Sequence, residues 1–344
     1  MKAIAVSQSG SPVTPNVVIL DDISRPEPGE GELRVRTEAS GLNHLDLWIG
    51  MGIPGIERPY PRITGSDGVG IVDAVGAGVD SEWIGKRIML NAAIAQEQDG
   101  KPHIRPAGED FTLVGEHGTG CLAEYFVAPA TQVLDIGNAD PLEAAAFGLV
   151  HLTAWRMLVT KARIEPGMTV LVPGIGGGVA LASMGIALHH ACTVIVTSRS
   201  QAKLDSAQAL GAHHGILDSG QDFSKEVRAI TDGRGCDICA ESVGKAIHKS
   251  CIKSLARGGV LVTCGSTSGP NPETDLTRIF WNQLSIMGST MGNMDEFRSV
   301  VALFKNGSLG AVIDSVHLST DPKDAYRRLE ESSQFGKVVI DWRS

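Results

Sequence analysis

The segment 169–191 constrains the possible folds of this chain more than any other. It reads TVLVPGIGGGVALASMGIALHHA, which predicts a short apolar strand, a glycine-rich turn and an apolar helix. In the turn, Gly174 allows a tight reversal, Gly177 lets the backbone approach a bound pyrophosphate, and Ala180 lets the helix pack on the strand. Free N–H groups at the start of such a helix favour an anion. The segment therefore predicts a dinucleotide site.

The residues after this turn repeat the alternation of strand and helix. Strands are expected at 193–200, 236–244 and 258–269, and a helix at 201–212. This alternation predicts an α/β fold with right-handed βαβ units and a doubly wound parallel sheet of the Rossmann type. The alternative is a glycine-rich turn without a ligand, and the strand-turn-helix setting argues against it.

The first third of the chain has a different character. Short segments rich in β-branched residues, such as 32–40, are separated by turns, and no long helical period occurs among them. This part is predicted to form a mainly β domain, a small barrel. The last part of the chain ends in a strand-like segment and is expected to rejoin that domain. The predicted division is 1–128 with 291–344 for the β domain, and 129–290 for the dinucleotide-binding domain.

Net charge and cysteine usage exclude several classes of protein. The 344 residues carry 30 Lys and Arg against 39 Asp and Glu, a net charge of −9, which argues against nucleic acid or an anionic membrane as a partner. The apolar stretches look too short or too often interrupted by glycine to span a bilayer, and no signal segment stands out, so a cytoplasmic location is expected. Six scattered cysteines, with one CxxC at Cys236 and Cys239, predict buried thiols and not a zinc site.

The end of the second strand of the nucleotide-binding unit selects the cofactor. An acidic residue there would accept hydrogen bonds from the ribose hydroxyls of NAD. The sequence instead has Ser198, Arg199 and then Lys203, and the first carboxylate is Asp205. Arginine can bind a 2′-phosphate through two parallel hydrogen bonds, so NADPH is predicted in preference to NADH. The alternative is that Arg199 is a solvated loop residue.

Several motifs, spread over nearly the whole chain, resemble those of the medium-chain dehydrogenase/reductase superfamily. The resemblance implies a GroES-like β domain beside a Rossmann domain, an active site in the cleft between them, and hydride transfer to or from a nicotinamide. The motifs that carry it, beside the glycine turn, are SGLNHLDLW at 40–48, GSDGVGIVDAVG at 65–76, LVGEHGTGCLAEYFVAP at 113–129, IMGSTMG at 286–292 and GKVV at 336–339.

The positions that match the zinc ligands of the family carry other residues. They are Asn43 for a cysteine, Ser66 for a histidine and Leu149 for a cysteine or glutamate. Amide and hydroxyl oxygens are poor zinc ligands, so no metal is predicted. The region 91–118, which matches the structural zinc lobe, contains no cysteine. An alternative metal site remains conceivable from residues that lie off the matching positions, namely His44, Asp46, Asp67 and His151.

Without a metal, stabilising an alkoxide is difficult, and the positions that match the family's proton relay are Leu45 and Trp48. We therefore expect a zinc-independent, NADPH-dependent oxidoreductase that transfers hydride to an activated alkene (enone or enoyl) or to a quinone, because hydrogen-bond donors alone can stabilise the enolate oxygen. Asn43 and Ser66 are the expected donors, and Thr153 is expected beside the nicotinamide. Two alternatives stay open: an alcohol dehydrogenase or carbonyl reductase with a non-standard metal site, and a non-catalytic NADPH-binding protein.

The resemblance also implies cofactor contacts and assembly. His44 and Lys337 match basic positions that contact the cofactor, and the strand at 284–290 lies where relatives pair their sheets, so a homodimer or homotetramer with a small-molecule substrate is expected. Trp48 and Trp281 are expected to shape an apolar pocket. The remaining expected cofactor contacts are Gly174, Gly177, Gly178, Val179, Ser198, Arg199, Lys203, Ser242, Val243, Cys264 and Gly265.

Overall fold

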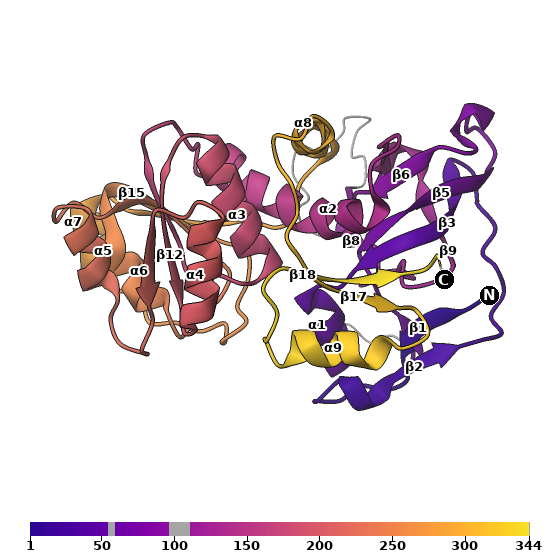
Figure 1. Cartoon of the computed structure of the whole chain (residues 1–344), viewed down its shortest axis with the longest axis horizontal. Coiled ribbons are helices and arrows are strands. Elements are labelled where there is room, and N and C mark those ends of the chain that lie inside the picture. Colours follow the sequence, from indigo (N-terminus) through magenta and orange to yellow (C-terminus); the bar gives the residue numbers. More distant parts are fainter. Residues whose placement is uncertain (54–58, 96–110, 344) are drawn as a thin grey trace. The chain divides into compact units, whose positions relative to one another are not determined.

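The computed structural model describes residues 1–53, 59–95 and 111–343 (Figure 1). They form two compact units, Met1–Leu149 with Gly292–Ser344, and Val150–Met291. This division differs from the predicted one by the segment 129–149, which belongs to unit 1, and by Met291, which belongs to unit 2. The reason is strand pairing: the strand β10 (Val133–Asp135) lies antiparallel to β6 (Arg87–Leu90), with Val133 opposite Leu90.

Unit 1 is built on a seven-stranded sheet, as the prediction of a mainly β domain requires. Its strands follow the order β10-β6-β5-β3-β18-β17, and β9 also pairs with β3. The C-terminal strand β18 pairs with β3, with Ile340 opposite Ser40, so the end of the chain does rejoin this unit. The strands not yet bounded are β3 (Glu32–Gly41), β5 (Asp67–Val75), β9 (Tyr125–Pro129), β17 (Ile313–Leu318) and β18 (Lys337–Asp341).

Two smaller sheets, the helices α1, α8 and α9 and the first part of α2 (Pro141–Trp155) also lie in the described part of unit 1. Tyr326 is fully buried among apolar side chains such as Ile4, Leu42 and Ile340, so α9 is fixed against the strands. The small sheets are β2-β1-β4, from β1 (Ala3–Val6), β2 (Val17–Leu20) and β4 (Arg62–Ile63), and the pair β7 (Ala93–Ala95) and β8 (Phe111–Leu113). The helices are α1 (His44–Met51), α8 (Met294–Lys305) and α9 (Pro322–Glu330).

Unit 2 is a six-stranded parallel sheet in the order β13-β12-β11-β14-β15-β16, with helices α3 to α7 beside it (Figure 1). The order reverses at β11, which pairs with β12 on one side and β14 on the other, so the sheet is doubly wound as predicted. The strands are β11 (Thr169–Val172), β12 (Thr193–Ser198), β13 (His214–Leu217), β14 (Cys236–Glu241), β15 (Leu255–Thr263) and β16 (Ser285–Gly288). The helices are α3 (Gly178–His189), α4 (Gln201–Ala209), α5 (Ser224–Ile230), α6 (His248–Ser254) and α7 (Leu276–Asn282).

The chain passes from unit 1 to unit 2 within α2 (Pro141–Trp155), which continues as a π-helical turn to Lys161. Among the described residues, Pro141–Lys161 is long and apolar enough by composition to cross a membrane, contrary to the expectation from the sequence. However, 72% of its most apolar window is buried inside the protein. Its apolar character is therefore that of a core helix.

The α5–α6 pair generates a prediction about pH. Burial of the Asp222 carboxyl would raise its pKa, but hydrogen bonds from the Lys253 ammonium, 2.5 Å away, and from Ser224 outweigh burial and lower the pKa to about 2. A carboxyl whose folded pKa is lowered contributes stability that is present above its unfolded pKa and is lost as the pH falls toward the folded value. We therefore expect Asp222→Asn to destabilise unit 2 at pH 7, and the difference from wild type to shrink from about pH 4 downward.

Urea unfolding of both proteins at pH 7, 5, 4 and 3 measures this difference. The control is Asp205→Asn, which changes an exposed carboxylate of the same unit. A difference between wild type and Asp222→Asn that stays constant down to pH 3 would contradict the prediction.

Candidate active site

The positions that were compared with zinc ligands lie in a buried polar network of unit 1. The Lys337 ammonium donates to Asn43 Oδ1 at 2.7 Å and to Asp67 Oδ2 at 2.9 Å. The Asn43 amide donates to the same Asp67 oxygen at 2.9 Å. The Lys337 and Asp67 side chains are only 4% and 2% exposed, so this ion pair is shielded from water. A salt bridge of this kind depends on close hydrogen bonding, because both charges have lost their hydration.

The strand register brings these residues together. Gly41, the last residue of β3, lies opposite Asp67 on one side and Val339 on the other, which places the first residues of β5 and β18 near each other. A Cβ atom at Gly41 would come within 2.3 Å of the Ala145 carbonyl oxygen and 3.1 Å of Lys337 Cε. Glycine is therefore required there, chiefly because the Ala145 carbonyl oxygen of α2 approaches so closely.

Helix α2 contributes a backbone group to the same carboxylate. The Leu149 N–H donates to Asp67 Oδ1 at 2.7 Å. A Cβ atom at Gly148 would lie 2.9 Å from that oxygen, so the small residue keeps the approach open. Leu149 thus contacts the network through its peptide group, whereas a zinc ligand at this position would act through its side chain.

Asp46 joins the two segments that border the network. Its carboxylate accepts the Asn43 N–H at 2.8 Å, which caps α1, and the Gly65 N–H at 2.8 Å. Burial raises the pKa of the Asp46 carboxyl, while hydrogen bonds from Asn43, Thr64 and Gly65 oppose the rise. The Thr64 hydroxyl lies 3.0 Å from the Tyr326 hydroxyl, so this anchor reaches the core of the unit.

Both predicted hydrogen-bond donors point into the protein. The Asn43 amide hydrogens are directed at Asp67 and, at 3.3 Å, at the Gly41 carbonyl oxygen. Ser66 is fully buried, and its hydroxyl donates to the Val114 carbonyl oxygen at 2.7 Å. In this arrangement neither group is presented to a substrate. Asn43 belongs to the network, whereas Ser66 precedes Asp67 in the chain and its hydroxyl bonds to Val114.

His44 follows Asn43 as the first residue of α1. Burial lowers the pKa of its imidazole, and the Lys337 ammonium lowers it further. At neutral pH the ring is therefore neutral and able to donate a hydrogen bond, but it carries no charge for a phosphate. Its ring makes a tilted contact with Trp48, at 6.5 Å between centroids.

The donor groups of this network do not fit a zinc ion. Leu149 offers no side-chain ligand, and the polar atoms of Asn43 and Ser66 already have partners inside the protein. An ammonium group, which repels a second cation, lies against Asp67. Among the described residues, no group of three or more His, Cys, Asp and Glu side chains is placed to hold a metal ion.

The glycine-rich turn of unit 2 has the backbone that the sequence suggested. Gly174 has φ of +69°, and a Cβ atom there would lie 2.7 Å from Val243 Cγ2, so the turn requires glycine. Gly177 caps α3, and a Cβ atom on it would meet nothing within 4 Å. Gly178 and Val179 form the first turn of that helix. The helix N-terminus is thus formed as a phosphate site requires.

The basic residues expected near the ribose lie beside this turn. Ser198 ends β12 and is buried, whereas Arg199 is exposed. The Lys203 side chain, from the first turn of α4, runs against the glycine turn: a Cβ atom at Gly176 would lie 2.9 Å from its Cδ and 3.3 Å from its Nζ. Lys203 is thus a cationic side chain that lies against the turn before α3, while Arg199 follows the end of β12 at the surface.

Four of the remaining predicted residues lie at the carboxyl ends of strands in the unit 2 sheet, and Thr153 lies in α2. Ser242 and Val243 follow β14, and Cys264 and Gly265 follow β15, at the carboxyl ends of parallel strands where ligands of such sheets bind. Thr153 is buried in α2, and its hydroxyl points at Met291 Sδ, 3.8 Å away. Burial, and then the charge of Glu241, raise the pKa of Cys264 to about 12, so this thiol is not ionised at neutral pH.

Sequence reasoning missed the roles of three acidic residues. Asp46 and Asp67 hold the network of unit 1, and Glu241 accepts the Val243 and Gly244 N–H groups at 2.9 and 2.8 Å. Each lies inside a motif that was read for its glycines or its lost ligands. For Asp67 the available signal was a carboxylate between two glycines, Gly65 and Gly68, at the start of a strand.

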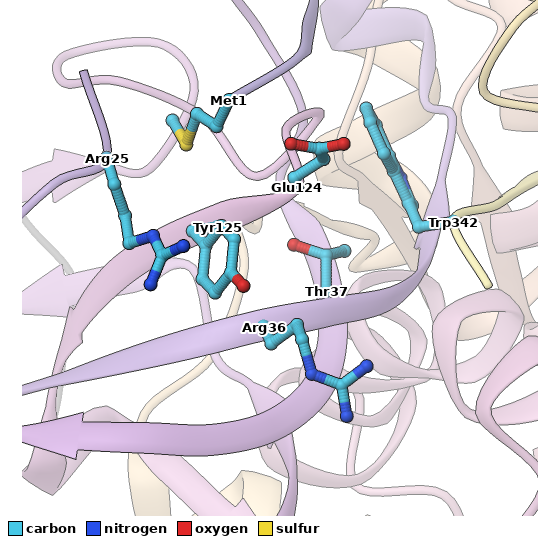
Figure 2. A pocket seen from close by; sticks show the side chains of 7 residues that line it. All are labelled: Met1, Arg25, Arg36, Thr37, Glu124, Tyr125 and Trp342. Atoms are coloured by element: carbon cyan, nitrogen blue, oxygen red, sulfur yellow. The ribbon is translucent and has the colours of Figure 1, made fainter. Parts of the chain in front are cut away.

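A separate hollow of about 380 Å³ lies on the surface of unit 1 (Figure 2). Its walls include Arg25, stacked 4.3 Å from the centre of the Tyr125 ring, and Trp342, whose indole N–H donates to Ser40. None of the predicted catalytic or cofactor-binding residues lines it. It is therefore distinct from the network described above.

Comparison with known proteins places the chain in a family. Residues 29–138 match the alcohol dehydrogenase GroES-like domain, and residues 178–306 match the zinc-binding dehydrogenase domain. A zinc-type alcohol dehydrogenase-like protein of Schizosaccharomyces pombe is 30% identical over 90% of each chain.

Two solved structures extend the comparison. A crystal structure of an NAD-dependent alcohol dehydrogenase is 36% identical, with a TM-score of 0.91, over 99% of this chain and 100% of that one. The 2-octenoyl-CoA carboxylase reductase CinF, solved with NADP and 2-octenoyl-CoA, is 25% identical, with a TM-score of 0.88, over 99% of this chain and 87% of that one. Fold, motifs and relatives agree: the chain belongs to the medium-chain dehydrogenase/reductase superfamily and is an NAD(P)H-dependent oxidoreductase.

Proposed function

We propose that this oxidoreductase works without zinc and transfers hydride from NADPH to an activated alkene, an enone or enoyl compound, or to a quinone. The observation that carries the proposal is which residues occupy positions 43, 66 and 149, the three that match the zinc ligands of the family. Asn43 and Ser66 have their polar atoms bonded within the protein, and residue 149 is a leucine. Chemistry that needs a metal-bound alkoxide has no ligand set there, whereas alkene reduction needs only hydrogen-bond donors.

The chemical step is balanced without a metal. Hydride adds to the β-carbon, the carbon–carbon π bond breaks, and its electron pair moves onto the carbonyl oxygen as an enolate. A proton from water or from a ribose hydroxyl then adds to the α-carbon. For Asn43 to donate to that enolate oxygen, its hydrogen bond to Gly41 is the one to exchange, because at 3.3 Å it is the longer of its two donated bonds.

The choice of NADPH is supported by the residues beside the glycine turn. No carboxylate ends β12, while Arg199 follows it and Lys203 lies against Gly176. The CinF structure contains NADP, which agrees with this choice.

The NAD-dependent alcohol dehydrogenase has the higher sequence identity to this chain of the two solved structures. It favours a second candidate function, an alcohol dehydrogenase or carbonyl reductase that uses NADH.

Turnover measurements with and without a chelator test the proposal. We expect oxidation of NADPH, followed at the nicotinamide absorbance, with members of a panel of enones, enoyl thioesters and quinones. The rate should be unchanged after dialysis against EDTA or 1,10-phenanthroline, because no step uses a bound metal. A zinc-dependent alcohol dehydrogenase treated in parallel is the control for metal removal.

Two outcomes would overturn the proposal. Zinc at about one ion per chain, with activity lost on chelation, would favour the alcohol dehydrogenase. NADPH binding with no turnover across the panel would favour a non-catalytic NADPH-binding protein.

Replacing Arg199 tests the cofactor assignment. A hydrogen bond to a charged group contributes about 1.5–3 kcal/mol, so Arg199→Ala should weaken NADPH binding by roughly 10-fold to 100-fold while NADH binding changes little. Fluorescence titration of both cofactors measures the two dissociation constants. The matched control is Arg257→Ala. This exposed arginine lies near the start of β15, at the end of the sheet where the parallel strands begin, whereas the cofactor is expected where they end. Equal weakening of both cofactors would refute the role of Arg199.

We also propose that the chain forms a homodimer or homotetramer through the free edge of β16. The neighbouring helix α7 exposes Leu276, Phe280 and Trp281 at 71%, 66% and 69%. Trp281 is therefore a surface residue of the described chain, and the expectation that it lines an apolar pocket is not met. An apolar patch beside an unpaired strand edge suits pairing with a second copy.

Light scattering on a Trp281→Glu variant tests this assembly. We expect the variant to have a lower mass than wild type at the same concentration, because a charge would be buried in the interface. Leu217→Glu, at β13 on the other edge of the sheet, is the control and should leave the mass unchanged. A monomeric wild type would contradict the proposed assembly.

The cytoplasmic location stays a proposal too, supported by six free cysteines.

A further inference from the structure

We propose that the surface hollow of unit 1 binds a small zwitterion, an amino acid with an aromatic or apolar side chain. The hollow has a volume of about 380 Å³, which lies within the range of small-molecule sites (Figure 2). The side chains that carry the inference are those of Arg25, Arg36, Glu124, Tyr125 and Trp342. None of them belongs to the proposed reaction or to the expected cofactor site, so the inference goes beyond the proposed function.

The arginines of the hollow differ from most others of unit 1. Among the described residues, neither Arg25 nor Arg36 has a carboxylate partner, and both side chains are exposed. Six other arginines of the unit form ion pairs with carboxylates, namely Arg34, Arg87, Arg298, Arg327, Arg328 and Arg343. A guanidinium group binds a carboxylate well, because it offers parallel donors. Two such groups left unpaired beside one hollow therefore favour a ligand that carries a carboxylate.

A carboxylate borders the same hollow. Glu124 Oε2 accepts the Lys2 N–H at 2.8 Å, and Glu124 forms no ion pair with any described cation, the two arginines included. Figure 2 shows the Glu124 carboxylate and the Arg36 guanidinium on opposite sides of Thr37. A simple anion would be repelled by Glu124 and a simple cation by the arginines. A zwitterion satisfies both, because its carboxylate can face the arginines while its ammonium faces Glu124.

Two aromatic rings provide an apolar surface for the side chain of the ligand. The Arg25 guanidinium lies 4.3 Å from the centre of the Tyr125 ring, and this contact holds the cation at the hollow. Trp342 is half-buried, and its indole N–H donates to Ser40 Oγ at 3.1 Å, so the ring is fixed and its polar atom is satisfied. Such rings bind aromatic and apolar groups. The amino acid is therefore expected to carry a side chain of that kind.

Hydrogen bonds fix the backbone around the hollow. Arg36 lies opposite Tyr125 in the pairing of β3 with β9, and the Thr37 N–H donates to the Glu124 carbonyl oxygen at 2.9 Å. The Trp342 N–H donates to a carbonyl oxygen of the same strand, β3, at 3.0 Å. Binding would therefore not have to order the backbone, which lowers its entropic cost.

Titration of the full chain with L-phenylalanine tests the inference. The chain has five tryptophans, and Trp342→Phe identifies the indole N–H signal of Trp342 in the NMR spectrum of isotope-labelled protein. We expect L-phenylalanine to shift this signal in a saturable way. Phenylpropanoate lacks the ammonium and phenethylamine lacks the carboxylate. Each should bind up to about 5-fold more weakly, because one exposed ion pair contributes little.

Two variants remove one charge each from the hollow. Glu124→Gln keeps an oxygen for the Lys2 N–H, and L-phenylalanine should then bind no better than phenylpropanoate. Arg36→Met keeps an apolar stem, and L-phenylalanine should lose most of its advantage over phenethylamine. The matched control is Arg298→Met, which changes an exposed arginine of unit 1 that pairs with Asp295. This control should leave the three dissociation constants unchanged.

The inference is wrong if the three compounds bind with equal affinity, or if the Trp342 signal does not respond to L-phenylalanine. Binding that neither Glu124→Gln nor Arg36→Met weakens would also contradict it. Calorimetric titration of the wild type and the two charge variants gives the same comparison if Trp342→Phe does not fold. These measurements use neither NADPH nor turnover, so their outcome is independent of the proposed function.

Discussion

The charge of one buried carboxylate organises unit 1. Asp67 lies at the start of β5, and its carboxylate accepts three hydrogen bonds. The donors are a peptide N–H of α2, the side-chain amide of the residue that caps α1, and the ammonium at the start of β18. These groups come from three separate parts of the chain, and 270 positions separate Asp67 from Lys337. Since each group satisfies the same buried anion, the loss of one would expose the others to an uncompensated charge.

The two units divide the work in a way that follows from their folds. A doubly wound sheet offers the turn after β11 and the strand ends at 242–243 and 264–265 to a dinucleotide. A mainly β unit can instead hold a polar network rigidly, because its strands fix the spacing of side chains. The residues that could polarise a substrate therefore depend on unit 1 alone, and those that would choose the cofactor depend on unit 2.

Local patterns in the sequence predicted the class of unit 2, and distant contacts limited the prediction of unit 1. The turn at 174–180 and the alternation after it are local, so a doubly wound parallel sheet could be inferred, although β13 and the helices α5 to α7 were not predicted. The helix α1 was missed because its eight residues are short and its cap, Asn43, was read only as a lost ligand. The pairing of Lys337 with Asp67 depends on how β3 joins β5 and β18, which no local pattern contains. The boundary was predicted at 128/129, whereas the compact units divide within α2, because β10 pairs with β6 of unit 1.

The contact made by residue 149 has an evolutionary consequence. Asp67 is met by the peptide N–H of this residue, a group that every amino acid except proline carries. The side chain of residue 149 therefore takes no part in this contact, so its type can change without loss of the hydrogen bond. Homologues that share this arrangement can carry a different side chain at this position and still keep the hydrogen bond to the buried carboxylate.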